Sequence, residues 1–272
     1  MDEPGFAWRD ATVAIVGLGL MGGSLALALR GKCARIVAVE RAARTRDAAR
    51  GIVDDASGEL SLIANADVIV LALPVRAIIE QLPRVGAVAR AGAIVMDLCS
   101  TKRAIVRAME QLPAPVEPIG AHPLCGKETS GFDAADAQLF RHAAFALTPL
   151  ARTAPQTLAF AQSLVETLGA RPLVLDAARH DKIVAAISHL PFALATALMT
   201  TANEIARVDD LVFALAASGF RDASRLAASD TTMMLDILLT NRDNVADALR
   251  ASALNLETLA DAIERGDATA LR

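Results

Sequence analysis

Apolar residues in the first two thirds of the chain occur in short runs separated by segments that suit helices. Residues 12–17 form the first run, followed by glycines and by an apolar stretch at helical spacing, residues 24–30, that ends at Gly31. Later runs are residues 36–39, 68–73, 93–96, 116–121, 144–148 and 172–175, with a helix expected over 155–168. Strands that alternate with helices predict a parallel sheet with right-handed crossovers.

The pattern changes near residue 177, after which no further strand is predicted. The remaining sequence has helical spacing rich in Ala and Leu, with interruptions near Pro191, at Ser218-Gly219 and near Thr240-Asn241. The chain is therefore expected to consist of an α/β domain, residues 1–176, and an all-helical domain, residues 177–272.

A glycine-rich segment follows the first predicted strand and opens a helix. It reads Gly17-Leu18-Gly19-Leu20-Met21-Gly22, the spacing of a dinucleotide-binding turn. In such a turn Gly17 permits the tight bend, Gly19 lets the backbone approach a pyrophosphate, and Gly22 allows the helix to pack closely. The phosphates would then lie at the helix start, near Leu20 and Met21. The first domain is thus predicted to be a Rossmann-type nucleotide-binding domain.

The end of the second predicted strand bears on the choice of cofactor. Glu40 stands 23 residues beyond Gly17, where a carboxylate can accept hydrogen bonds from ribose hydroxyls. A carboxylate there favours NAD, whereas the neighbouring Arg41 and Arg44 leave NADP open as an alternative. Leu73 and Pro74 end another strand at the sheet edge where such folds bind ligands, although a simple strand stop explains them equally well.

Composition narrows the classes of partner. The net charge of -4 is scattered along the 272 residues and offers no basic stripe, which argues against nucleic acid. Residues 183–202 are apolar enough to raise the question of a membrane span, but Ser188, His189 and Pro191 interrupt them. We expect no membrane insertion and instead a helix covered by a second copy of the chain in a homodimer.

The cysteines and the N-terminus indicate a cytoplasmic protein. Cys33, Cys99 and Cys125 are odd in number and widely spaced, which fits reduced thiols better than disulfides. The first ten residues carry acidic side chains and lack the features of a secretory signal or transit peptide.

Two later strands bring polar residues to the predicted ligand-binding edge. Asp97-Leu98-Cys99-Ser100-Thr101-Lys102 follows one strand, and the segment from Gly120 to Glu128 follows the next. His122, one of only four histidines, could accept a proton near neutral pH. His122 and Cys125 also resemble half a metal site, but no second ligand pair has suitable spacing, so no metal is expected.

Together these motifs resemble the prephenate/arogenate dehydrogenase family. The resemblance runs through the glycine segment, Asp-Leu-Cys-Ser-Thr-Lys, and the histidine segment from His122 to Phe132. It continues through His180-Asp181, Ser188-His189-Leu190-Pro191 and the stretch from Gly219 to Asp230. The motifs follow the family's order across nearly the whole chain, and the segments around His122 and Arg225 are specific to it.

The resemblance implies oxidative decarboxylation of prephenate, arogenate or both, with hydride transfer to NAD, in tyrosine biosynthesis. It assigns His122 as the base that takes the proton of the ring hydroxyl and Ser100 as its hydrogen-bonding partner. It assigns Arg225 to a carboxylate of the anionic substrate, His189 to orienting that arginine, and Lys127 to the lining of the substrate site.

The chain departs from the family after Asp230. Many relatives continue with proline and then tryptophan, whereas this chain has Thr231 and, near the tryptophan position, Met234. A β-hydroxyacid dehydrogenase or imine reductase on the same architecture is one alternative, for which Lys182 is the nearest suitable lysine. A dinucleotide sensor without enzymatic activity is another.

Overall fold

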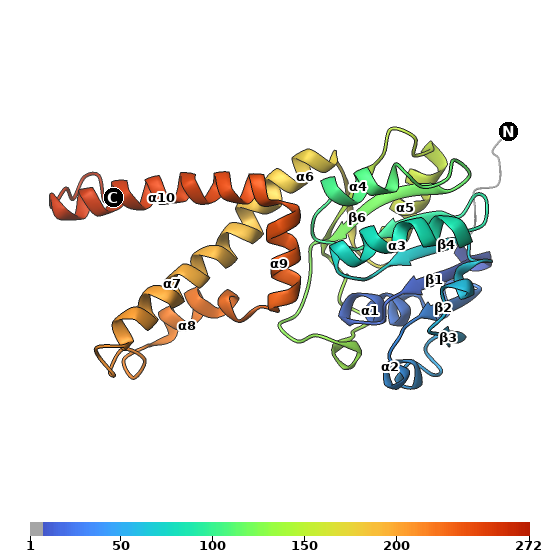
Figure 1. Cartoon of the computed structure of the whole chain (residues 1–272), viewed down its shortest axis with the longest axis horizontal. Coiled ribbons are helices and arrows are strands. Elements are labelled where there is room, and N and C mark those ends of the chain that lie inside the picture. The colour runs from blue at the N-terminus through green and yellow to red at the C-terminus, as the bar shows by residue number, and fades with distance from the viewer. Residues whose placement is uncertain (1–7) are drawn as a thin grey trace. The chain divides into compact units, whose positions relative to one another are not determined.

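The computed structural model describes residues 8–272 and divides the chain into two compact units, Met1–His180 and Asp181–Arg272. Figure 1 shows the first as a sheet with helices on its faces and the second as helices alone. The predicted fold class, a Rossmann-type α/β domain followed by a helical domain, is confirmed. The expectation of no secretory signal falls mainly on residues 1–7, which lie outside the described part.

The first unit is built on one eight-stranded sheet with the order β3-β2-β1-β4-β5-β6-β7-β8. The strands are β1 (Thr12–Val16), β2 (Arg35–Val39), β3 (Asp55–Ser57), β4 (Val68–Leu71), β5 (Ile94–Asp97), β6 (Glu117–Pro123), β7 (Ala144–Pro149) and β8 (Arg171–Val174). All neighbouring strands are parallel except β6 and β7, which are antiparallel.

The expectation of a wholly parallel sheet is therefore wrong at β7. A parallel neighbour needs a crossover connection, usually a helix, that carries the chain back to the opposite edge. Between β6 and β7 the chain forms a long loop whose only regular helix is the short η3 (Phe132–Ala134). The loop returns to the edge where β6 ended, so β7 runs in the opposite direction.

Helices cover both faces of this sheet. The helices of this unit that precede its last strand are α1 (Leu20–Leu29), α2 (Ala43–Ala48), α3 (Val75–Val88), α4 (Arg103–Met109) and α5 (Pro155–Thr167). Val13 and Ile15 point into the core that includes residues of α1 and α5, whereas Ala14 and Val16 point into the core with α3 and α4. Because both faces are buried at the centre of the sheet, the sequences of β1 and β4 are mostly apolar instead of alternating.

The second unit contains only helices among its described residues. The division between the units falls inside α6 (Ala177–Val184). The elements that follow are the π-helical segment η4 (Ala185–His189), α7 (Leu190–Ala206), α8 (Ser218–Ser224), η5 (Arg225–Ala228), α9 (Thr231–Thr240) and α10 (Arg242–Glu264).

The predicted interruption near Asn241 is confirmed, whereas the helix continues through Pro191 by way of a π turn, and Ser218-Gly219 begin a helix instead of breaking one. Pro191 lacks the N–H that a regular helix would donate to the carbonyl of Ile187, and the wider π turn of η4 lies directly before it. Ser218 begins α8, and Asn241 separates α9 from α10. Single-turn π segments occur often at functional sites, and this one contains His189.

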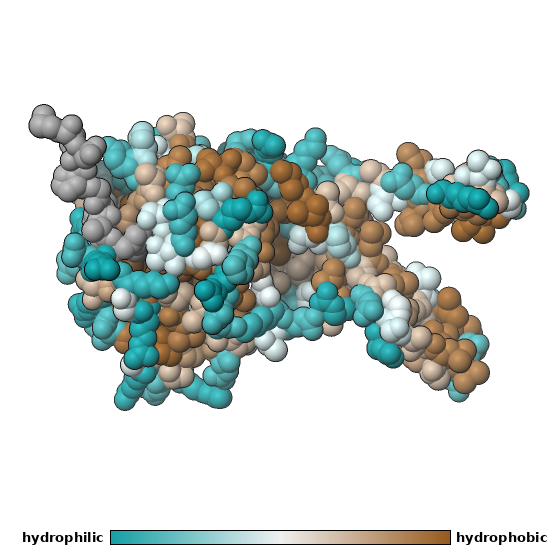
Figure 2. Space-filling view, turned by 180° about the vertical axis from the view of Figure 1, so that it is seen from behind, coloured by the Kyte–Doolittle hydropathy of each residue, from teal (hydrophilic) through white to brown (hydrophobic). Residues whose placement is uncertain are grey.

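Large apolar side chains lie exposed on the helical unit. Leu194, Leu198 and Ile205 on α7 are 36%, 37% and 53% exposed, and Leu254 and Ile263 on α10 are 63% and 60% exposed. Figure 2 shows brown, apolar surface along both helices. One helical stretch of the described residues, Ala177–Ala206, would pass for a membrane span by length and composition, with 22% of its apolar window buried. In the single chain these apolar faces of α7 and α10 are exposed to solvent.

Candidate active site

The glycine turn between β1 and α1 has the geometry of a phosphate-binding turn. Gly17 has φ +96°, and a Cβ there would lie 2.7 Å from the carbonyl oxygen of Ala72. A Cβ at Gly22 would lie 1.9 Å from the carbonyl oxygen of Gly17, so only glycine lets α1 start so close to the turn. By contrast, no atom lies within 4 Å of a Cβ built at Gly19. The face at Gly19 is open to a ligand.

The same turn meets the start of α1 and the end of β4. Gly19 is the N-cap of α1, so the free amides of the first helical turn, which begins with Leu20 and Met21, lie beside it. Leu73 packs against Gly17, and its neighbour Pro74 is the N-cap of α3. Anions bind well at such a helix start because its N–H groups and dipole both favour negative charge.

Glu40 is fixed at the end of β2 by two backbone amides. Its Oε2 accepts a hydrogen bond from the N–H of Leu18 at 3.0 Å, and its Oε1 accepts one from Ala42 at 2.8 Å. Each carboxylate oxygen keeps lone-pair capacity for a ribose hydroxyl. The residues present therefore fit NAD, in both the open glycine face and the oriented carboxylate.

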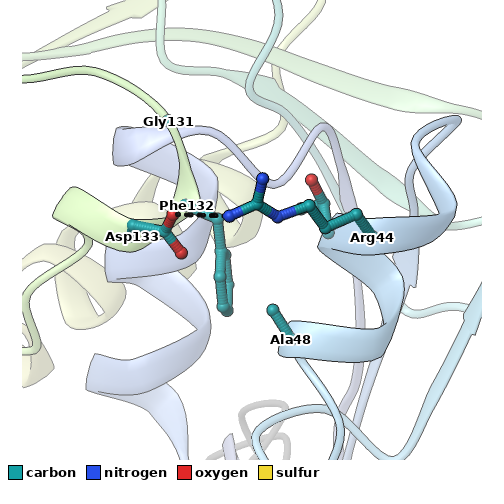
Figure 3. A pocket seen from close by; sticks show the side chains of 6 residues that line it. Arg44, Ala48, Gly131, Phe132 and Asp133 are labelled. Atoms are coloured by element: carbon teal, nitrogen blue, oxygen red, sulfur yellow. Dashed lines mark ion pairs between the residues drawn. The ribbon is translucent and has the colours of Figure 1, made fainter.

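The arginines near Glu40 differ in their contacts. Arg46 donates hydrogen bonds to the carbonyl oxygens of Glu40 and Arg41, which ties the start of α2 to the end of β2. The side chains of Arg41 and Arg44 are exposed, and Arg44 lies 3.9 Å from a carboxylate oxygen of Asp133. Figure 3 shows this pair across a shallow pocket between α2 and the turn at Gly131. Arg44 thus lies on α2, shortly after Glu40 in the chain, with its guanidinium in a long, exposed pair with Asp133.

The long loop after β6 is anchored on α1. The N–H of Asp136 donates to Oγ of Ser24 at 2.9 Å, and a Cβ at Gly23 would lie 2.8 Å from the ring of Phe132. Lys127 pairs with Asp136 at 3.0 Å. The N–H of Gln138, and next Lys127, lower the pKa of Asp136. The loop that carries Lys127 is thereby fixed next to the glycine turn, with its ammonium in this ion pair.

A buried ion pair connects the ends of β5 and β6. Lys102 and Asp97 are both fully buried and form an ion pair. Asp97 also accepts hydrogen bonds from the N–H groups of Cys99, at 2.8 Å, and Ala121, at 2.9 Å. Lys102 donates to the carbonyl oxygen of Ala121. The network fixes the turn that carries Ser100 against the residue before His122.

The sheet order aligns the predicted nucleotide and catalytic residues of the first unit. Strands β2, β1, β4, β5 and β6 are consecutive neighbours and mutually parallel. Glu40, Gly17, Leu73, Ser100 and His122 stand at or just beyond their carboxyl ends, in that order. Open α/β sheets bind ligands along this edge.

His122 meets a histidine that the sequence patterns did not single out as a site residue. Its Nδ1 lies 2.9 Å from Nε2 of His180 on α6, and the two rings meet edge to face at 72°. His122 is half-buried on β6, whereas His180 is 2% exposed. The sequence placed His180 only within a family motif. Its one distinguishing signal was the scarcity of histidine, four in the whole chain.

The site residues predicted in the second unit lie around η4 and η5. His189 is 1% exposed, and its Nδ1 lies 3.2 Å from the side-chain nitrogen of Asn241, which also donates to the carbonyl oxygen of Asp181. Arg225 begins η5, which packs against α7, and its side chain is exposed. Met234, near the family's tryptophan position, is buried on α9.

The cysteines beside the site have the environment of unreactive thiols. Burial raises the pKa of the Cys125 thiol to about 11. Cys99 is buried and its Sγ lies 3.3 Å from the carbonyl oxygen of Leu73. Within residues 8–272 no group of three or more His, Cys, Asp or Glu side chains could hold a metal ion.

Two family models match the chain. Residues 25–174 match the model described as the nucleotide-binding domain of prephenate dehydrogenase, and residues 176–272 match its dimerization domain. Among curated relatives, the prephenate dehydrogenase of Lactococcus lactis subsp. cremoris (strain MG1363) is 32% identical over 265 residues. That match covers 95% of this chain and 73% of the relative.

Solved structures agree with these matches. The arogenate dehydrogenase of Synechocystis is 33% identical, with a TM-score of 0.83 and coverage of 95% of this chain and 94% of that one. The prephenate dehydrogenase of A. aeolicus, solved with hydroxyphenyl propionate and NAD+, is 30% identical with a TM-score of 0.88. The latter match covers 94% of this chain and 92% of that one.

Proposed function

The chain belongs to the prephenate dehydrogenase family, and on that premise we propose that it oxidatively decarboxylates prephenate, arogenate or both, with hydride transfer to NAD. The products are 4-hydroxyphenylpyruvate from prephenate and tyrosine from arogenate. The observation that carries the proposal beyond family membership is the alignment of Glu40, Gly17, Ser100 and His122 along one edge of the sheet. The protein is thus an oxidoreductase of tyrosine biosynthesis.

The reaction needs a base at the ring hydroxyl and a hydride acceptor at the same carbon. NAD, when bound, supplies the acceptor. His122 takes the proton of the hydroxyl as the carbon–oxygen bond becomes a carbonyl. The carboxylate on the opposite, quaternary carbon then leaves as carbon dioxide, and the electron pair of its bond enters the ring. The oxygen becomes a phenolate and takes a proton back, and aromatisation makes the sequence irreversible.

The other residues serve binding and orientation. Ser100, on the turn fixed by Asp97 and Lys102, hydrogen-bonds the substrate hydroxyl beside His122. Arg225 holds a substrate carboxylate, for which its planar guanidinium can donate two parallel hydrogen bonds. His189 orients Arg225, and Lys127 lines the substrate site. The turn from Gly17 to Gly22, with Leu73 and Pro74, binds the dinucleotide.

Glu40 makes NAD the preferred nucleotide. Its carboxylate is held in place by two backbone amides. The additional ribose phosphate of NADP is also negative, so the carboxylate would repel it. Arg41 and Arg44 are exposed nearby and give NADP a weaker means of binding. We therefore expect activity with NAD to exceed activity with NADP.

The helical unit forms a homodimer. Its exposed apolar side chains on α7 and α10 are the kind of surface that a second copy covers, and the unit matches a dimerization domain. The same burial accounts for the apolar stretch Ala177–Ala206 in a soluble, cytoplasmic enzyme. A molar mass near twice 28.4 kDa in light scattering is the expected result.

Substitution of His122 tests the proposed reaction. In His122→Asn, NAD binding should stay at the wild-type level while turnover falls at least about 100-fold, the usual scale for losing a general base. His142→Asn is the matched control, because His142 is exposed in the turn just before β7 and has φ 64°, which asparagine tolerates. Wild-type turnover in His122→Asn would remove His122 from the reaction.

A further inference from the structure

The contact between His122 and His180 constrains where protons can lie. Nδ1 of His122 and Nε2 of His180 are 2.9 Å apart, a distance at which one nitrogen donates and the other accepts. When both imidazoles are neutral, each has one protonated and one unprotonated nitrogen. Two arrangements are therefore available, and they leave opposite protonation states at Nε2 of His122.

In the first arrangement His122 donates its Nδ1–H to His180, and Nε2 of His122 keeps its lone pair. In the second, His180 donates its Nε2–H, and Nε2 of His122 carries a proton and cannot act as a base. We propose that His180 is a positioning residue that accepts the Nδ1–H of His122, and so keeps Nε2 of His122 as the base. This inference rests on the proposed function of His122.

The first arrangement also fits both states that a base passes through. Once His122 has taken the substrate's proton, both of its nitrogens carry hydrogen, and Nδ1–H still donates to His180. The hydrogen bond survives the change of charge without rotation of either ring. In the second arrangement, the Nε2–H of His180 needs an unprotonated Nδ1 on His122 as its acceptor. That hydrogen bond would be lost whenever both nitrogens of His122 carry hydrogen.

The position of His180 suits this role. It lies on α6, is 2% exposed, and its backbone N–H donates to the carbonyl oxygen of Asp176 at 3.0 Å. A buried side chain on a helix holds its partner in one orientation better than a mobile surface residue could. His122 is held by β6 on its other side, with Ala146 as its strand partner. Both rings thus come from regular elements.

Nitrogen-15 NMR of the histidine side chains tests the tautomer directly. The chain has only four histidines, so His122→Asn, His142→Asn and His180→Gln suffice to assign the signals of uniformly ¹⁵N-histidine-labelled protein. In the wild-type protein, at a pH where the imidazole of His122 is neutral, His122 should show a protonated Nδ1 and an unprotonated Nε2. A protonated Nε2 on neutral His122 in the wild-type protein would overturn the proposal independently of any activity measurement.

Two substitutions of His180 then separate positioning from packing. His180→Gln keeps an acceptor oxygen close to the position of Nε2, whereas His180→Leu fills similar space without an acceptor. We expect His180→Leu to lose the single Nδ1–H tautomer of His122 and to lower kcat roughly 100-fold with KM for NAD unchanged. His180→Gln should retain the tautomer and recover kcat to within about tenfold.

The outcomes distinguish this inference from the proposed function. Wild-type protein that shows the predicted tautomer but turns over neither prephenate nor arogenate would contradict the proposed function alone. Wild-type turnover with an unchanged kcat in His180→Leu would contradict the role of His180 alone. Equal losses in the Gln and Leu variants, with the tautomer unchanged in both, would reduce His180 to a packing residue.

Discussion

The buried pair of Lys102 and Asp97 gives the most quantitative prediction. Lys102→Met removes the ammonium and keeps most of the aliphatic side chain, so the packing changes little. The carboxylate of Asp97 is then fully buried with the N–H groups of Cys99 and Ala121 and without its cation. Breaking a buried ion pair by removing one partner costs about 3–5 kcal/mol, because an uncompensated charge stays buried.

That loss is large compared with the total stability of a domain, which is about 5–15 kcal/mol. In urea unfolding it corresponds to a midpoint lowered by roughly 1 to 2 M at an m-value near 3 kcal/mol per M. Because the network fixes the Ser100 turn against Ala121, we expect kcat to fall as well. Wild-type and variant must be compared at one protomer concentration, since the proposed dimerisation would contribute to stability.

Lys32→Met is the matched control. Lys32 is exposed, and its ammonium donates to the carbonyl oxygen of Thr167 at 2.9 Å. The free energy of unfolding should change by no more than about 0.5 kcal/mol, as is usual for surface substitutions. If Lys102→Met were as stable as Lys32→Met, the ion pair would not hold the ends of β5 and β6 together.

Three other predictions concern separate parts of the site. Gly22→Ala should lose both stability and NAD binding, because its Cβ would lie 1.9 Å from a backbone oxygen. Gly19→Ala has open space for its Cβ and should lose only NAD binding. Thermal unfolding measures the stability of both variants, and nucleotide titration measures their NAD binding. Arg225→Ala should raise KM for substrate about 10- to 100-fold, since hydrogen bonds to charged groups contribute about 1.5–3 kcal/mol, and Arg221→Ala on α8 is the exposed control with unchanged KM. Alkylation of Cys125 should be slow at pH 7.5 and accelerate towards pH 11, because burial raises its pKa to about 11; fast labelling at neutral pH would contradict this environment.

Much of the first unit was predictable because its strands and turns leave local signals. Strands buried on both faces appear as apolar runs, and the glycine turn needs particular residues at Gly17 and Gly22 for steric reasons. The direction of β7 was not predictable in this way. It depends on the path of the loop after β6, which is fixed by distant contacts such as that of Asp136 with Ser24.

The contacts around the candidate base were harder to predict than the base itself. His122 stands out at a strand end, but its partner His180 is 58 residues later and meets it only through the fold. The burial of Lys102 is equally hidden, since a lysine in a polar segment normally stays in solvent. Pairings between residues far apart in sequence leave no periodic pattern. Motifs therefore pointed to His122, but its contact with His180 is visible only in the folded structure.

Membership of one family also bears on the alternatives. A β-hydroxyacid dehydrogenase or imine reductase shares the architecture, and a sensor would share the nucleotide turn. Neither is favoured, because both parts of the chain match prephenate dehydrogenase domains and the relatives are named dehydrogenases of prephenate or arogenate.

The most direct test of oxidative decarboxylation is the absorbance of reduced nicotinamide with the purified protein, crossing prephenate and arogenate against NAD and NADP. The account predicts turnover in at least one pairing, faster with NAD, with one carbon dioxide released for each reduced nucleotide. Absence of turnover in all four pairings, in protein that still binds NAD, would contradict it.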